Sequence, residues 1–378
     1  MGMMMLVPTL PVYLQERADS LTAVSAVLAA AAIGGVAANV PVGILIGRMG
    51  ERVAFLGGLV AGAAGTAALA LGGGLWLAFL ACLVAGAGQA ARLVARQSYA
   101  RRVVDIGIRG RVMSIYGGIG RVGLLVGPLL GGFLGEAIGL PATFVVAGAF
   151  IAAALVPALI AGPGEDGRLE VADRPPRLGL ARLAREHGRI IALAGLGQLG
   201  GSLIRVGRLT VVPLYGAAIG LDVGEIGLVV GLAGGLDLLL FPMAGWLMDR
   251  FGRLYAIVPS FAGLGLGLML LPLTDTFWGM VAVGLVIGLA NGIGSGTMLT
   301  LSTDLAPGRN PAEFLGAIRL LSDLGRMLGP LVVGVVADRL DLSASAIVLG
   351  FVGLATALLF VVAIGEPADR QVPDGVTR

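Results

Sequence analysis

Eight charged side chains fall inside long apolar runs of this sequence, and their surroundings decide what chemistry they could do. They are six arginines and two aspartates, namely Arg92, Arg121, Arg205, Arg208, Asp237, Arg319, Asp323 and Arg326. If the runs cross a bilayer, each charge costs at least about 2.5 kcal/mol on insertion scales, so it should face a wet cavity or a charged partner. Each is therefore a candidate for ligand binding, proton transfer or an ion pair.

Asp237 is the candidate for proton transfer. It lies near the middle of an apolar run and has no basic residue three or four positions away, so no ion pair along its own helix is expected. A carboxyl group in this position can bind and release protons as its access to water alternates. We predict that Asp237 is the acid that couples proton movement to a conformational change. An ion pair with Arg121 or another cavity arginine is the competing interpretation.

A second acid lies between two arginines. Spacings of four and three residues place Arg319, Asp323 and Arg326 within about 60° on one helical face. We therefore expect an intramembrane ion pair that is structural, and we favour it over proton movement. Removal of one partner would leave a buried charge uncompensated.

The remaining polar residues of the apolar runs could line a cavity for a small molecule at the middle of the membrane. The expected lining is Gln89, Arg92, Tyr116, Arg121, Gln198, Arg205 and Asn291. Six arginines against two aspartates leave an excess of four positive charges within the runs. This excess favours an anionic or zwitterionic substrate.

The composition requires that most of the protein surface faces lipid. Of the 378 residues, 57% are hydrophobic and 13% are charged, against roughly 25% charged in an ordinary soluble domain. The mean hydropathy is +0.95. The runs are continuous and rich in Ala, Leu and Gly, whereas a membrane barrel needs alternating apolar and polar residues. The composition thus excludes a water-soluble globule and indicates an all-α integral membrane protein.

Eleven apolar runs reach the roughly 20 residues that a helix needs to cross a bilayer. They cover residues 21–46, 53–73, 75–95, 113–135, 140–161, 190–219, 223–248, 255–274, 278–300, 314–337 and 343–364. A shorter run at 3–14, with Pro8 and Pro11, is the twelfth. We therefore predict twelve transmembrane helices.

The arginines predict the orientation. All 26 basic residues are arginine, and 18 of them lie in loops and tails on the side of the N-terminus, against only Arg17 and Arg339 on the other side. The positive-inside rule then places both termini in the cytoplasm of a multi-pass protein of the cell inner membrane. The net charge of +3 reflects this orientation and gives no reason to expect a nucleic-acid partner.

An internal repeat divides the chain into two halves. Residues of the two halves match when 202 is added to the number in the first half. This offset relates Gly43 to Gly245, Arg48 to Arg250, Gly86 to Gly288, Gln89 to Asn291 and Pro128 to Pro330. An offset that holds over six spans indicates two pseudo-symmetric six-helix bundles. We place them at residues 1–161 and 190–364, with a cytoplasmic linker at 162–189 and a cytoplasmic tail at 365–378. The linker residues 178–189 should form either a short amphipathic helix on the membrane surface or a solvated stretch of chain.

The same offset tests the start of the chain. Met1 corresponds to Leu203, whereas the seventh run begins near residue 190. The first helix is therefore shorter than its counterpart by 203 minus 190, or about 13, residues. The run 3–14 reaches only about 18 Å, less than the roughly 30 Å hydrocarbon core. We expect a wrongly assigned start site or a truncated chain, and thus an N-terminally shortened first helix.

A loop motif follows the second helix of each half. The second copy reads Gly-x-Leu-x-Asp-Arg-x-Gly-Arg and contains Gly245, Asp249, Arg250, Gly252 and Arg253. It resembles the loop signature of the major facilitator superfamily of secondary transporters, and the resemblance covers essentially the whole chain. The resemblance implies that Asp249 closes the cytoplasmic side by contact with the positive N-terminus of the fifth transmembrane helix.

The first copy of the loop contains Gly43, Arg48, Gly50 and Arg52, but Gly47 stands where the family has an acid. The corresponding clamp should therefore be weak. In the competing interpretation, both loops only solvate their end of the helices and follow the orientation rule.

A glycine pattern marks the fifth transmembrane helix. It consists of Gly123, Gly127, Pro128, Gly131 and Gly132. Glycines at every fourth position let another helix approach closely, and the proline permits a bend. The pattern is similar to that of family members that export a substrate in exchange for protons, and generic tight packing is the alternative. A further exporter pattern is absent from the fourth helix, where Cys82 replaces the family's arginine.

The sequence holds no nucleophile and base set, no phosphate-binding Gly-Lys motif and no metal-ligand cluster, so we expect no enzyme, no cofactor and no metal. We predict a monomeric alternating-access transporter that exports a small organic molecule in exchange for protons. The alternatives are facilitated diffusion or uptake of an organic anion, and a transport-inactive membrane scaffold or sensor.

Overall fold

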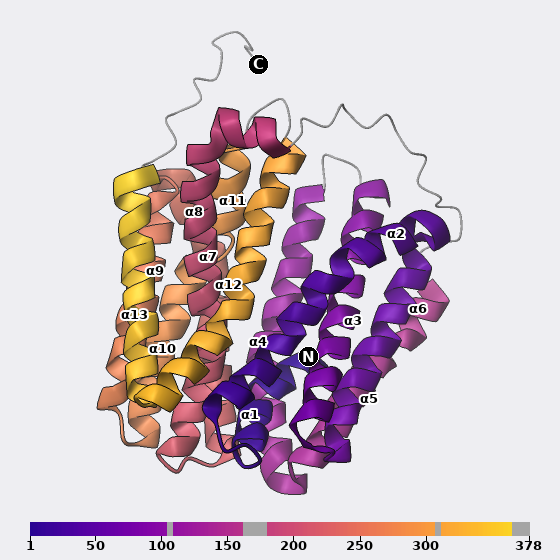
Figure 1. Cartoon of the computed structure of the whole chain (residues 1–378), viewed down its shortest axis with the longest axis vertical. Coiled ribbons are helices and arrows are strands. Elements are labelled where there is room, and N and C mark those ends of the chain that lie inside the picture. The colour runs from indigo at the N-terminus through magenta and orange to yellow at the C-terminus, as the bar shows by residue number, and fades with distance from the viewer. Residues whose placement is uncertain (104–108, 162–179, 307–310, 365–378) are drawn as a thin grey trace.

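The computed structural model describes residues 1–103, 109–161, 180–306 and 311–364, and this part of the chain is almost wholly helical (Figure 1). The elements are α1 (Gly2–Gln15), α2 (Leu21–Ala68), η1 (Leu69–Leu71), α3 (Gly74–Val103), α4 (Arg109–Ile138), α5 (Leu140–Ala153), α6 (Leu155–Ala161), α7 (Leu180–Ala218), α8 (Val223–Phe251), α9 (Leu254–Leu270), η2 (Leu271–Leu273), α10 (Phe277–Ile293), α11 (Thr297–Asp304), α12 (Pro311–Arg339), α13 (Leu342–Leu359) and η3 (Phe360–Ile364). The predicted all-helical fold is confirmed.

Ten helical segments within the described ranges are long and apolar enough to cross a bilayer. One of them, Leu21–Leu71, has 51 residues and is interrupted at Gly50, whose φ of 86° and ψ of 168° are not helical. It therefore supplies two of the predicted helices, 21–46 and 53–73. Together with the 14-residue α1, the described segments match the twelve predicted helices.

The element boundaries follow the offset of the internal repeat. α4 and α12 begin at the equivalent positions Arg109 and Pro311, and α5 and α13 begin at Leu140 and Leu342. Gly252 has φ 105° and ψ 169°, nearly the conformation of Gly50. In Figure 1 the helices α1–α6 lie on one side of the molecule and α7–α13 on the other. We call these two sets the N-terminal half and the C-terminal half.

Glycines bring the two halves together at one end of the molecule. A Cβ on Gly132 of α4 would lie 2.8 Å from the carbonyl oxygen of Val223 at the start of α8. A Cβ on Gly334, the repeat equivalent of Gly132 on α12, would lie 2.5 Å from the carbonyl oxygen of Leu21 at the start of α2. The first approach is near the turns α4–α5 and α7–α8, and the second is near the turns α1–α2 and α12–α13. These turns are at the lower end of the molecule in Figure 1. We call this end the closed end.

One predicted helix, over residues 278–300, is broken. α10 ends at Ile293, Gly296 has a left-handed φ of 81°, and α11 begins at Thr297. Glycine adopts a positive φ without the steric cost that other residues meet, so the Gly-Ile-Gly-Ser-Gly sequence of residues 292–296 permits the break. The break exposes the backbone carbonyl of Gly294 to side chains of other helices.

α7 begins earlier than predicted. It starts at Leu180, so residues 180–189 of the predicted linker are helical and continue directly into the transmembrane part of α7. The rest of the predicted linker, 162–179, and the tail, 365–378, lie outside the described residues.

Candidate functional site

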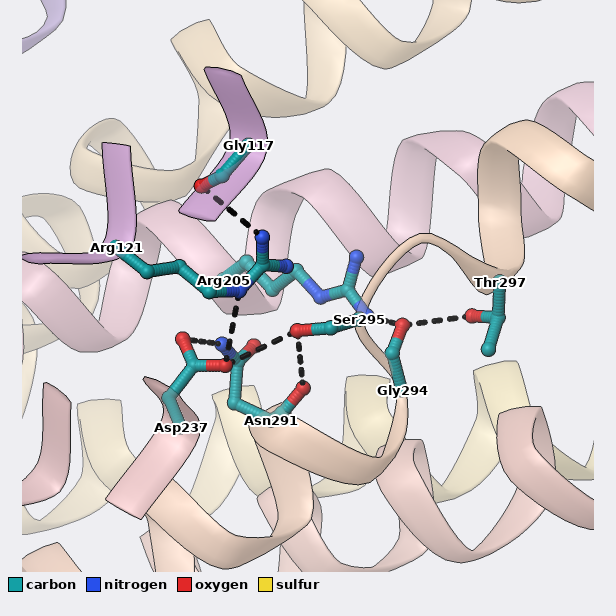
Figure 2. Close-up of polar contacts among 8 residues, drawn as sticks. All are labelled: Gly117, Arg121, Arg205, Asp237, Asn291, Gly294, Ser295 and Thr297. Carbon is teal, nitrogen blue, oxygen red and sulfur yellow. Dashed lines mark hydrogen bonds and ion pairs between the residues drawn. The ribbon is translucent and has the colours of Figure 1, made fainter. Parts of the chain in front are cut away.

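Asp237 lies at the centre of a polar cluster between the two halves (Figure 2). It is on α8 and is 2% exposed. Asn291 Nδ2 donates a hydrogen bond to its Oδ2 at 2.8 Å, and Ser295 Oγ donates one to its Oδ1 at 3.0 Å. Asn291 is near the end of α10 and Ser295 lies in the break that follows, so the break determines which donors reach the carboxylate.

An arginine from the other half pairs with Asp237. Arg121 of α4 places its Nε 3.7 Å from Asp237 Oδ1, and its guanidinium lies 3.9 Å from the centre of the Phe241 ring. Its Nη1 donates to the carbonyl of Gly117 at 3.4 Å. The competing interpretation of Asp237, an ion pair with Arg121, is therefore what the structure contains. The pair joins the N-terminal half to the C-terminal half.

Two further arginines lie near this acid. Arg205 of α7 donates from Nη2 to the carbonyl of Gly294 at 2.9 Å and interacts electrostatically with Asp237. Arg208, one helical turn further, lines a small cavity of about 30 Å³ together with Asp237. Such a volume suits one or two water molecules. Three arginines and one aspartate give this cluster a net formal charge of +2.

Several buried polar atoms of the cluster, both donors and an acceptor, have no hydrogen-bond partner among the described residues. They are the Nε atoms of Arg121, Arg205 and Arg208 and the Oδ1 of Asn291. The 3.7 Å between Arg121 Nε and Asp237 is an ion pair but is too long for a hydrogen bond. Buried polar atoms normally have partners, so these atoms mark a place where water, a proton carrier or a ligand would be accommodated.

A larger cavity, of about 340 Å³, lies between the two halves and shares Val7 and Leu209 with the small one. α1, α2 and α3 form its N-terminal wall, and α7 and α12 form its C-terminal wall. Its polar lining consists of Asn39, Gln89, Thr210, Arg319 and Arg326, and Cys82 also lies on its wall. A cavity of this size is typical of small-molecule sites.

The seven residues predicted to line one cavity are separated in the structure. Gln89 is on the wall of the 340 Å³ cavity, whereas Arg121, Arg205 and Asn291 belong to the Asp237 cluster. The other three have partners elsewhere, because neighbouring helices offer them contacts that sequence spacing does not reveal.

Arg92, Tyr116 and Gln198 are these three residues. Arg92 Nη1 donates to the carbonyl of Gly58 at 2.7 Å, within the N-terminal half. The Tyr116 ring lies 4.9 Å from the guanidinium of Arg96. Gln198 Nε2 donates to the carbonyl of Met298 at 3.1 Å. None of these three residues lines the 340 Å³ cavity.

The predicted ion pair on α12 is present with one of its two arginines. Asp323 is buried and pairs with Arg326. Arg319 is exposed toward the cavity, and no ion pair joins it to Asp323 within the described residues. Arg319 thus contributes a positive charge to the cavity wall, and none of the carboxylates in the described part of the chain forms an ion pair with it.

The loop after α8 holds its charges at the end opposite the closed end. Asp249 is 83% exposed and lies 3.5 Å from Arg253, whose Nε is also 2.9 Å from Asp304. The side chains around the start of α4, which the predicted contact of Asp249 would involve, are outside the described part. Arg250 is exposed near Trp246, and Gly245 has space around it.

The loop within α2 differs from its repeat partner. Gly43 and Arg48 are exposed, and Arg52 Nη2 donates to the carbonyl of Leu159 at 3.1 Å. Glu51 is 2% exposed and accepts a hydrogen bond from Ser98 at 3.1 Å. The contacts of Glu51 with Ser98 and of Asp304 with Arg253 could not be predicted from the sequence, because the partners are about 50 positions apart along the chain.

The glycine pattern of α4 has two packing partners. Side chains at Gly127 and Gly131 would collide with Met4 and Met5 of α1, and a Cβ on Gly123 would lie 3.4 Å from Met1. Gly132 faces α8 of the other half, and the carbonyl of Pro128 would lie 2.6 Å from a Cβ on Gly227. The pattern therefore packs α4 against α1 and closes the contact between the halves.

Two acids at equivalent positions of the repeat lie on helix N-termini across the closed end. Asp338 of α12 accepts hydrogen bonds from Ser20 Oγ at 2.5 Å, Leu21 N at 2.7 Å and Thr22 N at 2.8 Å, at the start of α2. The carboxylate of Glu136 on α4 occupies the place that a side chain at Gly224, at the start of α8, would take. We call these two contacts the acid latches. Negative charge at a helix N-terminus is favourable.

Comparison with known proteins gives a family match over the whole chain. The model described as "Major Facilitator Superfamily" matches residues 1–215 and 194–377. An uncharacterized MFS-type transporter of Bacillus subtilis, YdeG, is 26% identical over 345 residues, which cover 84% of this chain and 78% of that protein.

Other curated relatives match shorter stretches. A triacylglyceride transporter of Mycobacteroides abscessus is 34% identical over 133 residues, or 35% of this chain and 26% of that protein. The class H tetracycline resistance protein of Pasteurella multocida is 24% identical over 30% of this chain and 28% of that protein. The chain thus aligns with only about a quarter of the length of these relatives.

Solved structures share the fold. The nucleoside transporter NupG superposes with a TM-score of 0.76 at 15% identity, over 96% of this chain and 95% of that one. A bacterial homologue of the human lysosomal transporter Spinster, in an inward-facing and unoccupied conformation, gives a TM-score of 0.70 at 16% identity, over 96% and 91% of the two chains.

Proposed function

The chain belongs to the major facilitator superfamily, and on that premise we propose that it is a secondary active transporter that exports a small organic molecule in exchange for protons. Members of this family move solutes by alternating access, and they are not enzymes. The proposal for this chain rests on its own cavity, its interface between the halves and its buried charges.

The observation that carries the proposal is the 340 Å³ cavity between two repeat-related halves that touch at the closed end. Rocking of the halves about this cavity would open the closed end and close the opposite one. Because the arginine-rich loops lie opposite the closed end, we place that opposite end, and both termini, in the cytoplasm. The cavity would then receive substrate from the cytoplasm.

Proton coupling is proposed to act through the ion pair between Arg121 and Asp237. A proton on Asp237 would remove its negative charge and release Arg121, and with it one polar contact between α4 and α8. The water-sized cavity beside Asp237 offers space for a proton carrier. Proton binding and movement of the two halves would thus be linked through the ion pair between Arg121 and Asp237.

Export is supported by the glycine pattern of α4, which resembles that of proton-exchanging exporters. Among the relatives are a tetracycline resistance protein and a triacylglyceride transporter. They also include monocarboxylate transporter 10 of Danio rerio and a staphyloferrin B transporter of Staphylococcus aureus, so the named relatives do not share one substrate.

The test is solute flux in proteoliposomes under an imposed pH gradient, with a panel that contains tetracycline, a monocarboxylate and a nucleoside. We expect at least one solute to move against its gradient. Asp237→Asn should abolish this pH-driven accumulation and leave downhill exchange of the same solute. Asp275→Asn, an exposed acid in the turn before α10, is the matched control and should behave as wild type.

A second candidate function is facilitated diffusion of an organic anion. The specific observation in its favour is that Asp237 already has a basic partner, Arg121. Flux that does not respond to the pH gradient would support this candidate. Absence of flux for every solute would instead support a membrane scaffold or sensor.

A further inference from the structure

The two walls of the 340 Å³ cavity differ in chemistry. The wall formed by α1, α2 and α3 is apolar apart from Asn39 and Gln89. The wall formed by α7 and α12 carries Arg319 and Arg326. A molecule that fills the cavity therefore meets hydrocarbon on one side and guanidinium groups on the other.

The charges of this cavity do not cancel. Asp323 pairs with Arg326, and the cavity lining contains no carboxylate within the described residues. Arg319 is left as one unit of positive charge. The guanidinium of Arg319 is exposed to the cavity, so its hydrogen-bond donors are available to an acidic group of a ligand.

The neighbouring cluster adds to this preference. Asp237 and its three arginines, beside the smaller cavity, have a net formal charge of +2. Both polar regions at the interface of the halves are thus positive, and together they attract anions and repel cations from the space between the halves.

We infer that the substrate is an amphipathic organic monoanion, whose carboxylate or similar acid group binds Arg319 while its apolar body lies against the wall of α1, α2 and α3. This inference rests on the proposed function, because it names the class of molecule that the transporter would carry. An arginine binds a carboxylate through two parallel hydrogen bonds, so the acid group would also fix the orientation of the ligand.

The experiment measures equilibrium binding to the purified full-length chain in detergent, with three probes of the same shape. They are 2-naphthoate, its neutral amide 2-naphthamide and the cation 2-naphthylmethylamine. We expect 2-naphthoate to bind at least about tenfold more tightly than the other two, as the loss of a hydrogen bond to a charged group implies. Equal binding of the three probes, or binding of none of them, would overturn the inference.

The variants identify the arginine. Arg319→Gln should remove the preference for 2-naphthoate, and Arg319→Lys should retain part of it. Arg339→Gln, at the exposed end of the same helix, should bind as wild type does. Because Arg319 is exposed, Arg319→Gln should fold normally, and its thermal unfolding in detergent checks this. A preference that survives in Arg319→Gln would contradict the assignment.

Reconstitution of the same samples separates the two proposals. Binding of 2-naphthoate without flux in proteoliposomes would contradict transport and leave the anion site intact. Flux of 2-naphthamide or 2-naphthylmethylamine at the rate of 2-naphthoate would contradict the anion site and leave transport intact.

Discussion

At the scale of single residues, the main finding is that the acid in the middle of α8 is part of an interface between the halves. Asp237 has Arg121 from α4 as a charged partner and Asn291 and Ser295 as hydrogen-bond donors. A buried ion pair affects stability mainly through the cost of removing one partner, because the other partner is then left as an uncompensated buried charge. Arg121 and Asp237 should therefore be coupled in stability as well as in transport.

Arg121→Gln should lower the free energy of unfolding by about 2–3 kcal/mol, because it leaves Asp237 buried without a charged partner. The double variant Arg121→Gln with Asp237→Asn should regain most of the loss. Denaturation of the purified protein in detergent measures both. Glu16→Gln, which breaks an exposed pair with Arg17 and leaves the contacts of Arg17 with Tyr13 in place, is the control and should cost less than about 1 kcal/mol. Equal losses in Arg121→Gln and Glu16→Gln would contradict a buried role for the pair.

At the scale of elements, the closed end is held by helix ends that meet across the two halves. Gly132 and Gly334 let the backbones of α4 and α12 approach the starts of α8 and α2. Asp338 then caps the first turn of α2 from the other half. An acid latch of this kind combines hydrogen bonds with the favourable position of a carboxylate at a helix N-terminus.

Asp338→Asn should weaken the closed end, because the amide loses the charge and one of the two oxygen acceptors. A loss of about 1 kcal/mol would move the ratio of closed to open molecules by roughly fivefold. Spin labels at Leu71 and Leu273, which are exposed and equivalent in the repeat, measure the distance between the halves at this end. The labels require a Cys82→Ala background.

Asp341→Asn is the matched control for this latch. Asp341 caps the start of α13 by accepting a hydrogen bond from Ala344 N at 2.6 Å, within its own half. Its loss should weaken a helix end and leave the distance between the halves unchanged. A longer distance in Asp341→Asn, or an unchanged one in Asp338→Asn, would count against a role of Asp338 in closure.

At the scale of the whole molecule, the backbone follows the repeat, whereas the buried charges between the halves do not. Gly50 and Gly252 make the same turn, and Trp76 and Trp278 are both exposed, as side chains that face lipid would be. In contrast, Asp237 corresponds to Gly35 of the first half. The symmetric backbone gives the two halves equivalent helix ends, while the asymmetric buried residues determine where charge is located.

The repeat predicts that equivalent substitutions have equivalent costs. Gly50→Ala and Gly252→Ala should each lower the free energy of unfolding by about 1–3 kcal/mol, because φ near +90° with ψ near 170° is a region open essentially to glycine alone. Gly43→Ala and Gly245→Ala are the controls, since they lie in helices and nothing is within 4 Å of an added Cβ. Thermal unfolding in detergent measures all four. A large loss in only one half would contradict the equivalence.

The sequence was sufficient for the features that depend on local composition and length. The apolar runs, the constant offset between the halves, the break at Gly50 and the pairing of Asp323 with Arg326 all follow from neighbours within a few positions, or from a comparison of the chain with itself. The alternating glycines at residues 292–296 are also a signal for the break before α11, although the length and hydropathy of that run favour a continuous helix.

Only the tertiary structure decided which side chains meet. Arg121 reaches Asp237, Arg205 reaches the carbonyl of Gly294, and Gln198 turns to Met298 instead of the central cavity. These contacts depend on the rotation of each helix about its axis and on its distance from helices that are far away in sequence. Local spacing fixes which residues share a helical face, but the packing of the helices fixes what that face contacts, and so whether a buried charge has a partner.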